Sequence, residues 1–496
     1  MSARVHSVLV VGSGVAARMA AVAIARRLPR VAVTHINTRE GDLLEDSLGA
    51  ARPSIRTFHD IVGIDEAEII RHTRGAYRLG TSVQGWSNCA YFRGHGMYGE
   101  PLGGVSFHQL WLRAGEAVKV GPYDAFCVAA ALASRARFAL PSPDPASPFA
   151  ALDYGLQLNL PAYTHALQML GRAAGVQEMA GHIETAERSA DGTSITSLRL
   201  ADGHRLTADL IVDASGCSAV ARRQLPSTWV DWSTHLPINR LIVARESPDR
   251  VPPPSDRLVA LPVGWRYEAR TLGGTVHLFG YASHHLSETE AHRAVHADTG
   301  CEADNPPFVL RQGRLTEPWI GNCVAIGAAA VSIEPTAATG VHLVCRHIER
   351  LIAHWPGRDC TATPVEVAFF NRRVGLEAER IRDFTQLPYL LTQRPEAFWR
   401  NAANGPVSQE LARDLALFRE RGRLVTHDED AFERDEWLAS LIGLGVRPRR
   451  TDPLADAIPP NLAEQRLVEA AARLGRAVDE TPTHAQWLQR LVAGTQ

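Results

Sequence analysis

The sequence lacks the features that mark metal-binding, secreted, membrane and nucleic-acid-binding proteins. Its 20 histidines form no H-E-x-x-H pair and its seven cysteines form no C-x-x-C pair, so we expect no bound metal and reduced, mostly buried thiols. No apolar run is long enough to span a bilayer and no signal-peptide pattern is present, which predicts a cytoplasmic protein with no membrane contact. The net charge of -2 gives no global field that would favour nucleic acid.

The chain instead has the length and composition of a large globular enzyme. It has 496 residues, of which 45% are hydrophobic and 21% charged, so it has ample apolar side chains for a composite core. Internal repeats and low-complexity tails are absent from the sequence. A homodimer and a monomer are both left open.

The N-terminus predicts a βαβ unit. A short β-branched strand over 6–11 precedes a glycine turn and an alanine-rich helix, and a second strand covers 31–37. The turn carries the pattern G-x-G-x-x-A, in which the first glycine permits the turn, the second admits a pyrophosphate, and a small third residue lets helix pack on strand. The second strand ends in an asparagine where an acid would hold a ribose, so we expect weaker binding than usual. The predicted dinucleotide-binding residues are Gly12, Gly14, Val15, Ala16, Ala17 and Asn37.

Two later segments also end strands in small residues. "DLIVDASGCS" (209–218) ends its strand in Asp213, and "VAIGAAA" (324–330) ends in Gly327 and Ala328, before the loop and helix "SIEPTAATGVHL" (332–343). The plain interpretation of Asp213 is a strand–turn boundary. The order of the three segments resembles FAD-dependent monooxygenases, and this resemblance implies FAD contacts at Gly327, Ala328, Pro335, Thr339 and Gly340.

The remaining segments predict an α/β fold with an FAD-binding Rossmann-like domain, an inserted β-sheet lobe on the substrate side and a helical C-terminal region. A helical stretch covers 53–73, a proline-rich connection 140–149, a hairpin and buried strand 194–216, and sheet 229–285. We predict a composite FAD-binding domain over 1–350, with sheet elements around 75–130 and 225–310, and a mainly helical substrate-side region over 351–496.

Several stretches are similar to a narrower family, the flavin-dependent tryptophan halogenases. They include "VGSGVAARMAA", "PSIRTFHDIVGIDEAEIIRHTRGAYRLG" (53–80) and "GNCVAIGAAAVSIEPTAATGVHL" (321–343), and further on "RIRDFTQLPYLLTQRPEAFWR" (380–400), "LGVRPRRTDPLAD" (444–456) and "PTHAQWLQRL" (482–491). The resemblance implies an enzyme in which reduced FAD from a separate NAD(P)H-dependent flavin reductase reacts with oxygen to a flavin hydroperoxide. A halide then gives hypohalous acid, which a lysine presents to an aromatic or indole substrate.

The chain departs from that family's pattern at the residues of the relay. Arg78 stands in the lysine's segment, and Ala337 and Ala338 stand where the family has a glutamate and a serine. The W-x-W-x-I-P signature corresponds to "GWRYEAR" (264–270), which keeps Trp265 and replaces the second tryptophan with Tyr267. The family's glutamate ahead of "PSIR" is also missing. Thr339 and Gly340, whose amides hold halide in the family, are retained.

These replacements leave three hypotheses. An arginine stays protonated and is a poor nucleophile, and an alanine cannot accept a proton, so our first expectation is a monooxygenase in which Arg78 orients substrate or oxidant. The second hypothesis is a halogenase that uses Arg78 in place of the lysine. The third is a non-catalytic descendant that binds a ligand or partner.

Plainer roles are open for several of these residues. Arg78 would also suit a surface salt bridge, and Trp265 and Tyr267 an ordinary strand. Phe398 and Trp399 are predicted either as core packing or as walls of a substrate pocket. Arg18, where the family usually has tryptophan, is predicted as a charge on the helix surface.

Overall fold

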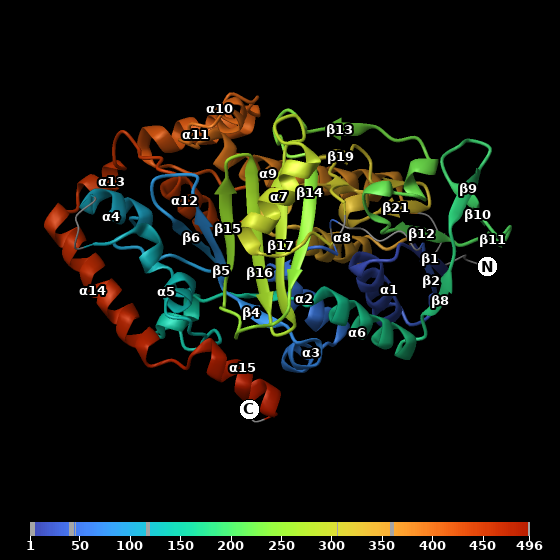
Figure 1. Cartoon of the computed structure of the whole chain (residues 1–496), viewed down its shortest axis with the longest axis horizontal. Helices are drawn as coiled ribbons and strands as arrows, with labels where there is room; N and C mark the ends of the chain where they lie inside the picture. The colour runs from blue at the N-terminus through green and yellow to red at the C-terminus, as the bar shows by residue number, and fades with distance from the viewer. Residues whose placement is uncertain are drawn as a thin grey trace.

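The computed structural model describes residues 5–38, 44, 46–115, 120–304, 306–357 and 362–494; Cys360, one of the seven cysteines, lies outside them. Figure 1 shows a parallel sheet at one end of the molecule, a long antiparallel sheet in the middle and C-terminal helices at the other end. Within the described residues, no helix is both long and apolar enough to cross a membrane.

The predicted Rossmann-like unit is present as a six-stranded sheet. β1 pairs in parallel with β2 on one side and with β12 on the other, and only the edge strand β20 runs antiparallel. α1 (Val15–Arg27) follows β1 and is almost entirely buried, because its alanines allow close packing against α6, α8 and the sheet. In spatial order the strands are β20 (Trp319–Ile320), β21 (Cys323–Ala325), β12 (Leu210–Asp213), β1 (Ser7–Val11), β2 (Ala32–Asn37) and β8 (Gln177–Ala180).

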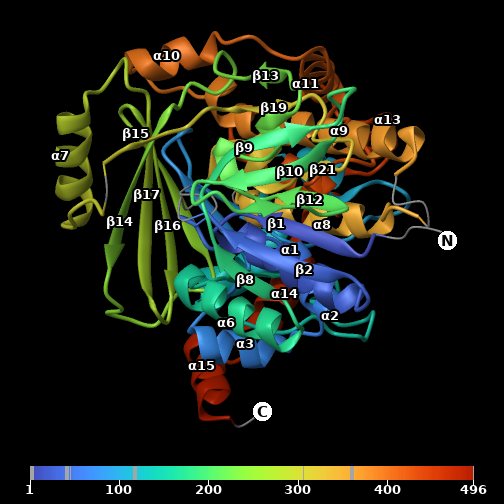
Figure 2. The ribbon, with the colours of Figure 1, turned by 90° about the vertical axis from the view of Figure 1, so that its right-hand side faces the viewer.

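A second sheet of seven strands forms a separate layer beside the first (Figure 2). Its pairs are antiparallel except for β15 with β5, and α7 (Glu288–Thr299) packs on its outer face. In spatial order the strands are β18 (Phe308–Val309), β14 (Arg240–Glu246), β17 (Gly274–Tyr281), β16 (Gly264–Thr271), β15 (Asp256–Leu261), β5 (Gly80–Gln84) and β6 (Tyr91–Gly94).

Three small sheets complete the β-structure. One of them, β3–β7–β4, pairs Gln157 of its central strand with Ala50 and Ala76 on the two outer strands. Their strands are β3 (Ala50–Ala51), β7 (Gly155–Gln157) and β4 (Ala76–Arg78); β11 (Arg205–Leu206), β10 (Ile195–Leu200) and β9 (Ile183–Arg188); and β13 (Trp229–Asp231), β19 (Gly313–Leu315) and β22 (Val331–Ser332).

The helices cover the sheets and dominate the C-terminal part. The stretch predicted as one helix over 53–73 is two helices, because Gly63 adopts φ 65° and Asp65 caps a new start. After Ala353 the described residues form helices and loops only. The helices not yet given are α2 (Ser54–Val62), α3 (Glu66–Thr73), α4 (Phe107–Ala114), α5 (Val128–Ser134), α6 (Leu160–Ala173), α8 (Gly340–Ala353), α9 (Pro364–Leu390), α10 (Ala397–Ala403), α11 (Gln409–Arg421), α12 (Arg434–Gly443), α13 (Pro453–Asp456), α14 (Pro460–Asp479) and α15 (His484–Ala493).

Arg18 differs from its prediction as a surface charge. It is 9% exposed, and its Nη1 lies 2.6 Å from Oε1 of Glu178 on β8. The prediction was wrong because the helix periodicity that places Arg18 away from β1 does not reveal that the edge strand β8 brings a carboxylate to it. Glu178 has its pKa lowered to about 2, because hydrogen bonds from Gln168, Arg18 and Arg172 outweigh the cost of its burial.

Candidate flavin and active site

The glycine turn after β1 leaves no room for a side chain. Gly12 adopts φ 143°, and a Cβ there would lie 2.2 Å from the backbone oxygen of Ala214. Its N–H donates to the oxygen of Ile36 at 3.0 Å, which ties the turn to β2. Ala16 and Ala17 are fully buried, so their small size serves the packing of α1 on the sheet.

A carboxylate occupies the N-terminus of α1. The N–H of Val15 donates to Oδ1 of Asp46 at 2.9 Å, and a Cβ on Gly14 would lie 2.4 Å from Oδ2 of the same side chain. The first turn of α1 holds no acidic residue of its own. Burial raises the pKa of Asp46, against the Val15 N–H and Arg18, which lower it. Asp46 thus stands in for an anionic group at the place where the sequence predicts a diphosphate. Asn37 ends β2 beside this turn, as predicted.

Asp213 closes a turn rather than facing a ligand. Its carboxylate is fully buried and accepts hydrogen bonds from the backbone N–H groups of Ser215, Ala221 and Arg222 at 3.0, 2.8 and 2.7 Å. The D-x-S-G pattern therefore has a local structural role here, which is the plain interpretation given to it from sequence.

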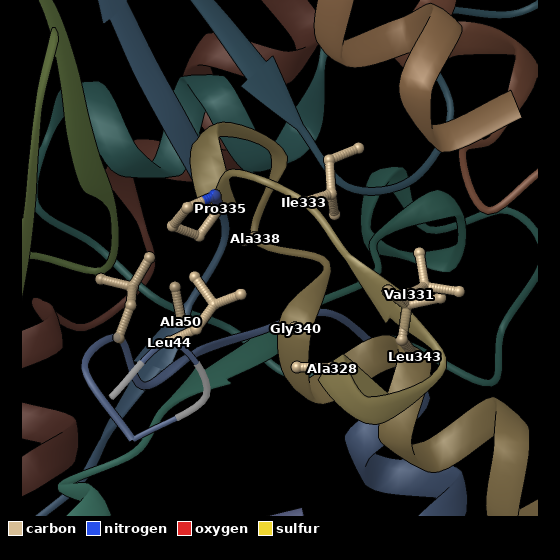
Figure 3. Close-up of a pocket in the computed structure, with 10 residues that line it drawn as sticks. Leu44, Ala50, Ala328, Val331, Ile333, Pro335, Ala338, Gly340 and Leu343 are labelled. Carbon is tan, nitrogen blue, oxygen red and sulfur yellow. The ribbon is translucent and has the colours of Figure 1, made fainter. Parts of the chain in front are cut away.

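The loop that leads into α8 faces an apolar cavity (Figure 3). Of the predicted flavin-contacting residues, Ala328, Pro335 and Gly340 line this cavity. Gly327 does not; its N–H donates to Nδ1 of His347 at 3.0 Å. Ala338 was noted from sequence only as a replaced serine. Sequence reasoning missed the other lining residues, which lie in the stretch ahead of "PSIR" and in the segment 321–343: Leu44, Leu48, Ala50, Val331, Ile333 and Leu343.

Thr339 lies at the N-cap of α8, and its hydroxyl makes no hydrogen bond to the described residues. Its side chain is fully buried, and Oγ1 has no hydrogen-bond partner among the residues that the structure describes. A buried hydroxyl without a partner costs free energy unless a ligand or water satisfies it. The apolar cavity, the helix end at α8 and the helix end at α1 together fit an extended ligand that has a flat ring and a diphosphate.

Arg78 lies in a buried polar cluster instead of on the surface. It is 2% exposed; its Nε donates to Oδ2 of Asp256 at 2.8 Å and its Nη2 to Oγ1 of Thr81 at 2.8 Å. The hydroxyl of Tyr267 donates to the same Asp256 oxygen. Burial alone would lower the pKa of Arg78, but Asp256 and Tyr267 raise it above its ordinary range. The two replacements noted from sequence, Arg78 and Tyr267, are thus parts of one cluster that also needs Asp256.

A second arm of the cluster runs through His95. The Nη1 of Arg78 donates to Nε2 of His95, so the ring's other nitrogen carries the proton and faces Oε1 of Glu436 at 3.5 Å. Burial lowers the pKa of His95, which keeps it neutral. Glu436 pairs with Arg52 at 2.6 Å. His95, Glu436 and Arg52 also line a polar cleft beside α8 and α12.

Glu334 is a buried carboxylate directly before the cavity loop. It accepts hydrogen bonds from the Tyr389 hydroxyl at 2.6 Å and from Nε2 of Gln312 at 3.1 Å, and Nε1 of Trp265 donates to Tyr389 at 3.0 Å. Burial raises the pKa of Glu334 to about 7, and Tyr389, Gln312 and Thr336 limit the rise. Trp265, retained from the signature, therefore helps to hold this loop.

The four predicted substrate-pocket residues are all buried. Tyr389 and Trp399 stack with ring centroids 5.6 Å apart, Phe398 packs edge-on to Trp399, and Nε1 of Trp399 donates to the oxygen of Leu261 at 2.7 Å. With Trp265 and Tyr267 they form part of the main core. Their contact with a substrate stays a prediction.

Comparison with known proteins now gives the class and the family. The tryptophan halogenase family model matches residues 7–460. Tryptophan 7-halogenase RebH of Lentzea aerocolonigenes is 26% identical, over 92% of this chain and 93% of its own. Among solved structures, the flavin-dependent halogenase BrvH of Brevundimonas sp. BAL3 is 31% identical with a TM-score of 0.91, over 98% of this chain and 99% of its own. The flavin-dependent halogenase Xcc4156 of Xanthomonas campestris is 27% identical with a TM-score of 0.91, over 98% of both chains.

The protein is therefore a flavin-dependent oxidoreductase of the class that uses FADH2 and O2. The chain belongs to the tryptophan halogenase family. The hypothesis of a non-catalytic descendant is not supported, and the comparisons support halogenation better than the halide-independent oxygenation that we expected first.

Proposed function

We propose that this protein is an FAD-dependent halogenase of an aromatic or indole substrate, with Arg78 in the place of the family's lysine. The observation that carries the proposal is the likeness along the whole chain to flavin-dependent halogenases, at 31% identity for one of them. A separate NAD(P)H-dependent flavin reductase would deliver reduced FAD, which would activate oxygen, and oxygen would be the oxidant of the reaction.

The N-terminus of α1, with Gly12, Gly14 and Val15, would hold the diphosphate, after Asp46 has given up its hydrogen bond to Val15. The apolar cavity lined by Ala50, Pro335 and Gly340 would hold the flat ring. Halide would be held at Thr339 and Gly340, where the hydroxyl of Thr339 is buried without a partner in the described part of the chain.

Arg78 is suited to act as a fixed hydrogen-bond donor and positive charge. It has five N–H hydrogens, and its contacts with Asp256, His95 and Thr81 use three of them. One hydrogen on each Nη remains to hold an oxidant or a substrate oxygen. Oδ1 of Asp256 beside it is buried and has no partner among the described residues. Because the guanidinium stays protonated, Arg78 would bind and orient rather than form a covalent bond.

Halide-independent oxygenation remains the second candidate because one observation favours it. Ala337 is 2% exposed and offers only a methyl group where the family has its glutamate. The methyl group of Ala337 cannot accept a proton from an aromatic ring during halogen transfer. Oxygenation would not need such an acceptor at this position.

A single assay separates the two candidates. Purified protein is given FAD, a flavin reductase, NADH and an indole or phenol, with and without bromide, and the products are analysed by mass. We expect a monobrominated product with bromide and none without it. A product that gains oxygen at the same rate in both conditions would overturn the proposal in favour of oxygenation.

Matched variants of the chain test the role of Arg78. Arg78→Met should lower brominated product at least about 10-fold, because the donor and charge are lost. The double variant Arg78→Lys, Ala337→Glu brings back the family's two side chains and tests whether they raise turnover. Arg245→Met is the control, because Arg245 is an exposed arginine paired with Asp304 on the outer edge of the long sheet.

A further inference from the structure

Gln157, the last residue of β7, is buried, and its side-chain amide makes no hydrogen bond within the described part of the chain. It is 1% exposed, and neither Nε2 nor Oε1 has a hydrogen-bond partner among the described residues. A buried amide without partners destabilises the folded protein, because its hydrogen bonds to water are lost and not replaced. Native proteins rarely keep such a group unless a ligand, an ion or an ordered water satisfies it.

The sheet register places Gln157 next to a residue that lines the flavin cavity. β7 lies between β3 and β4, so Gln157 stands directly opposite Ala50 on one side and Ala76 on the other. Directly opposite residues in antiparallel strands present their side chains on the same face, with Cβ atoms about 5 Å apart. Ala50 lines the cavity. Gln157 is not itself among the lining residues, but its two cross-strand neighbours offer it only methyl groups, so its amide is left without a protein partner beside the cavity.

Two glycines hold this arrangement firmly. A Cβ on Gly49 would lie 1.9 Å from the oxygen of Leu158, and one on Gly155 would lie 2.0 Å from the oxygen of Ala51. The N–H of Leu158 donates to the oxygen of Gly49 at 2.8 Å. The strands therefore pack too closely to slide, and Gln157 has a fixed position relative to Ala50.

We propose that Gln157 binds the ligand of this cavity through its amide, and that the ligand edge it recognises presents an N–H beside a C=O, as the pyrimidine ring of a flavin does. This rests on the proposed binding of FAD. A glutamine amide supplies one acceptor and two donors, which match such an edge. The residues that line the cavity are apolar, so one polar group that reaches it from beside Ala50 would fix the orientation of the ring.

A ligand-binding role of Gln157 and a purely structural role predict different effects on the Tm of the ligand-free protein and on FAD affinity. Replacing an unpartnered buried amide with an apolar side chain of similar size removes a desolvation cost. Gln157→Met should therefore raise the Tm of the ligand-free protein, by about 1–3 °C. The same change should weaken FAD binding about 10-fold, because two hydrogen bonds are lost. The two effects have opposite signs.

A second buried glutamine provides the matched control. Gln386 of α9 is fully buried and its Oε1 also has no partner among the described residues, but its Nε2 donates to the oxygen of Pro406 at 2.7 Å. Gln386→Met should lower the Tm and leave FAD affinity unchanged. Both variants are compared with the unmodified full chain by differential scanning fluorimetry without FAD, and by quenching of flavin fluorescence on titration with oxidised FAD.

A modified ligand identifies the recognised edge. FAD methylated at N3 cannot donate from that nitrogen, so the unmodified protein should bind it about 10-fold more weakly than FAD, and Gln157→Met should bind both equally. Ordinary FAD affinity in Gln157→Met, or a lower Tm without ligand, would overturn this inference alone. Failure of the unmodified protein to bind FAD would overturn the proposed function as well.

Discussion

The two ends of the proposed site are built on different principles. At the turn after β1 and in the cavity loop, backbone amides and small residues make the site, and Gly12 and Gly340 match the family's pattern. Around Arg78, side chains make the site, and the residues differ from that pattern together. Arg78 and Tyr267 meet at Asp256. The turn at Gly12 tolerates few changes, because an added Cβ would collide with the backbone of Ala214, whereas a side-chain cluster can be exchanged as a unit.

The largest expected effect breaks the side-chain cluster. Asp256→Leu leaves the charge of Arg78 buried without its partner, so the free energy of unfolding should fall by about 3–5 kcal/mol. Urea denaturation measures this loss. The double variant Arg78→Met, Asp256→Leu should recover most of it, because no charge is then buried. If Asp256→Leu alone were tolerated within 1 kcal/mol or so, Arg78 would not depend on this pair.

A pH experiment examines Glu334, a buried side chain that holds the loop leading into α8. Its pKa is raised from 4.5 to about 7 in the folded protein, so the folded state keeps the proton longer than the unfolded state does. Stability should therefore fall as the pH rises from about 4.5 to 7, by up to about 3 kcal/mol, and level off above pH 7. Glu334→Gln has no carboxyl group at this position, so it should not lose this stability between pH 4.5 and 7.

The measurement is the difference in unfolding free energy between Glu334→Gln and the unmodified protein at pH 5, 6, 7 and 8. Tyr389→Phe removes a donor to the carboxylate, so it should move the end of the decline to higher pH. The side chains that lower the pKa of Glu334 are Tyr389 of α9, Gln312, Thr336 and Trp265. Arg93 of β6 donates to the oxygen of Thr336 at 2.7 Å. A difference that stays constant with pH would show that Glu334 does not titrate in this range.

The smallest of the three effects tests the backbone end. Gly14→Val should weaken FAD binding at least about 100-fold, or about 2.7 kcal/mol, since its side chain occupies the place where Asp46 now approaches and a diphosphate would lie. Flavin fluorescence quenching measures it. Gly475→Val on α14 is the control, because a Cβ there meets only Nη2 of Arg135 at 3.6 Å. Equal FAD affinity in both variants would place the diphosphate elsewhere.

The sequence predicted the local elements well where one residue type dominates. The β-branched strand, the glycine turn and the alanine helix of the first unit appear as β1, Gly12 and α1. It was less successful where packing between distant segments decides. The buried ion pair of Arg18 depends on Glu178 of β8, a partner that no local pattern contains. The break within 53–73 is local instead, because it comes from Gly63 and the capping Asp65, and the prediction of one helix missed it.

For the site, three of the small or rigid residues predicted to contact the flavin, Ala328, Pro335 and Gly340, line the cavity, and their contact with a flavin stays a prediction. Tertiary structure alone decided the rest. It joined Arg78 to Asp256, 178 residues further along the chain, and it placed Gln157 opposite Ala50 with nothing to bond. Such contacts cannot be predicted from sequence, because the same carboxylate or amide can be solvated, paired or buried without a partner. Burial and the register of neighbouring strands distinguish these states, and both are set by the tertiary structure.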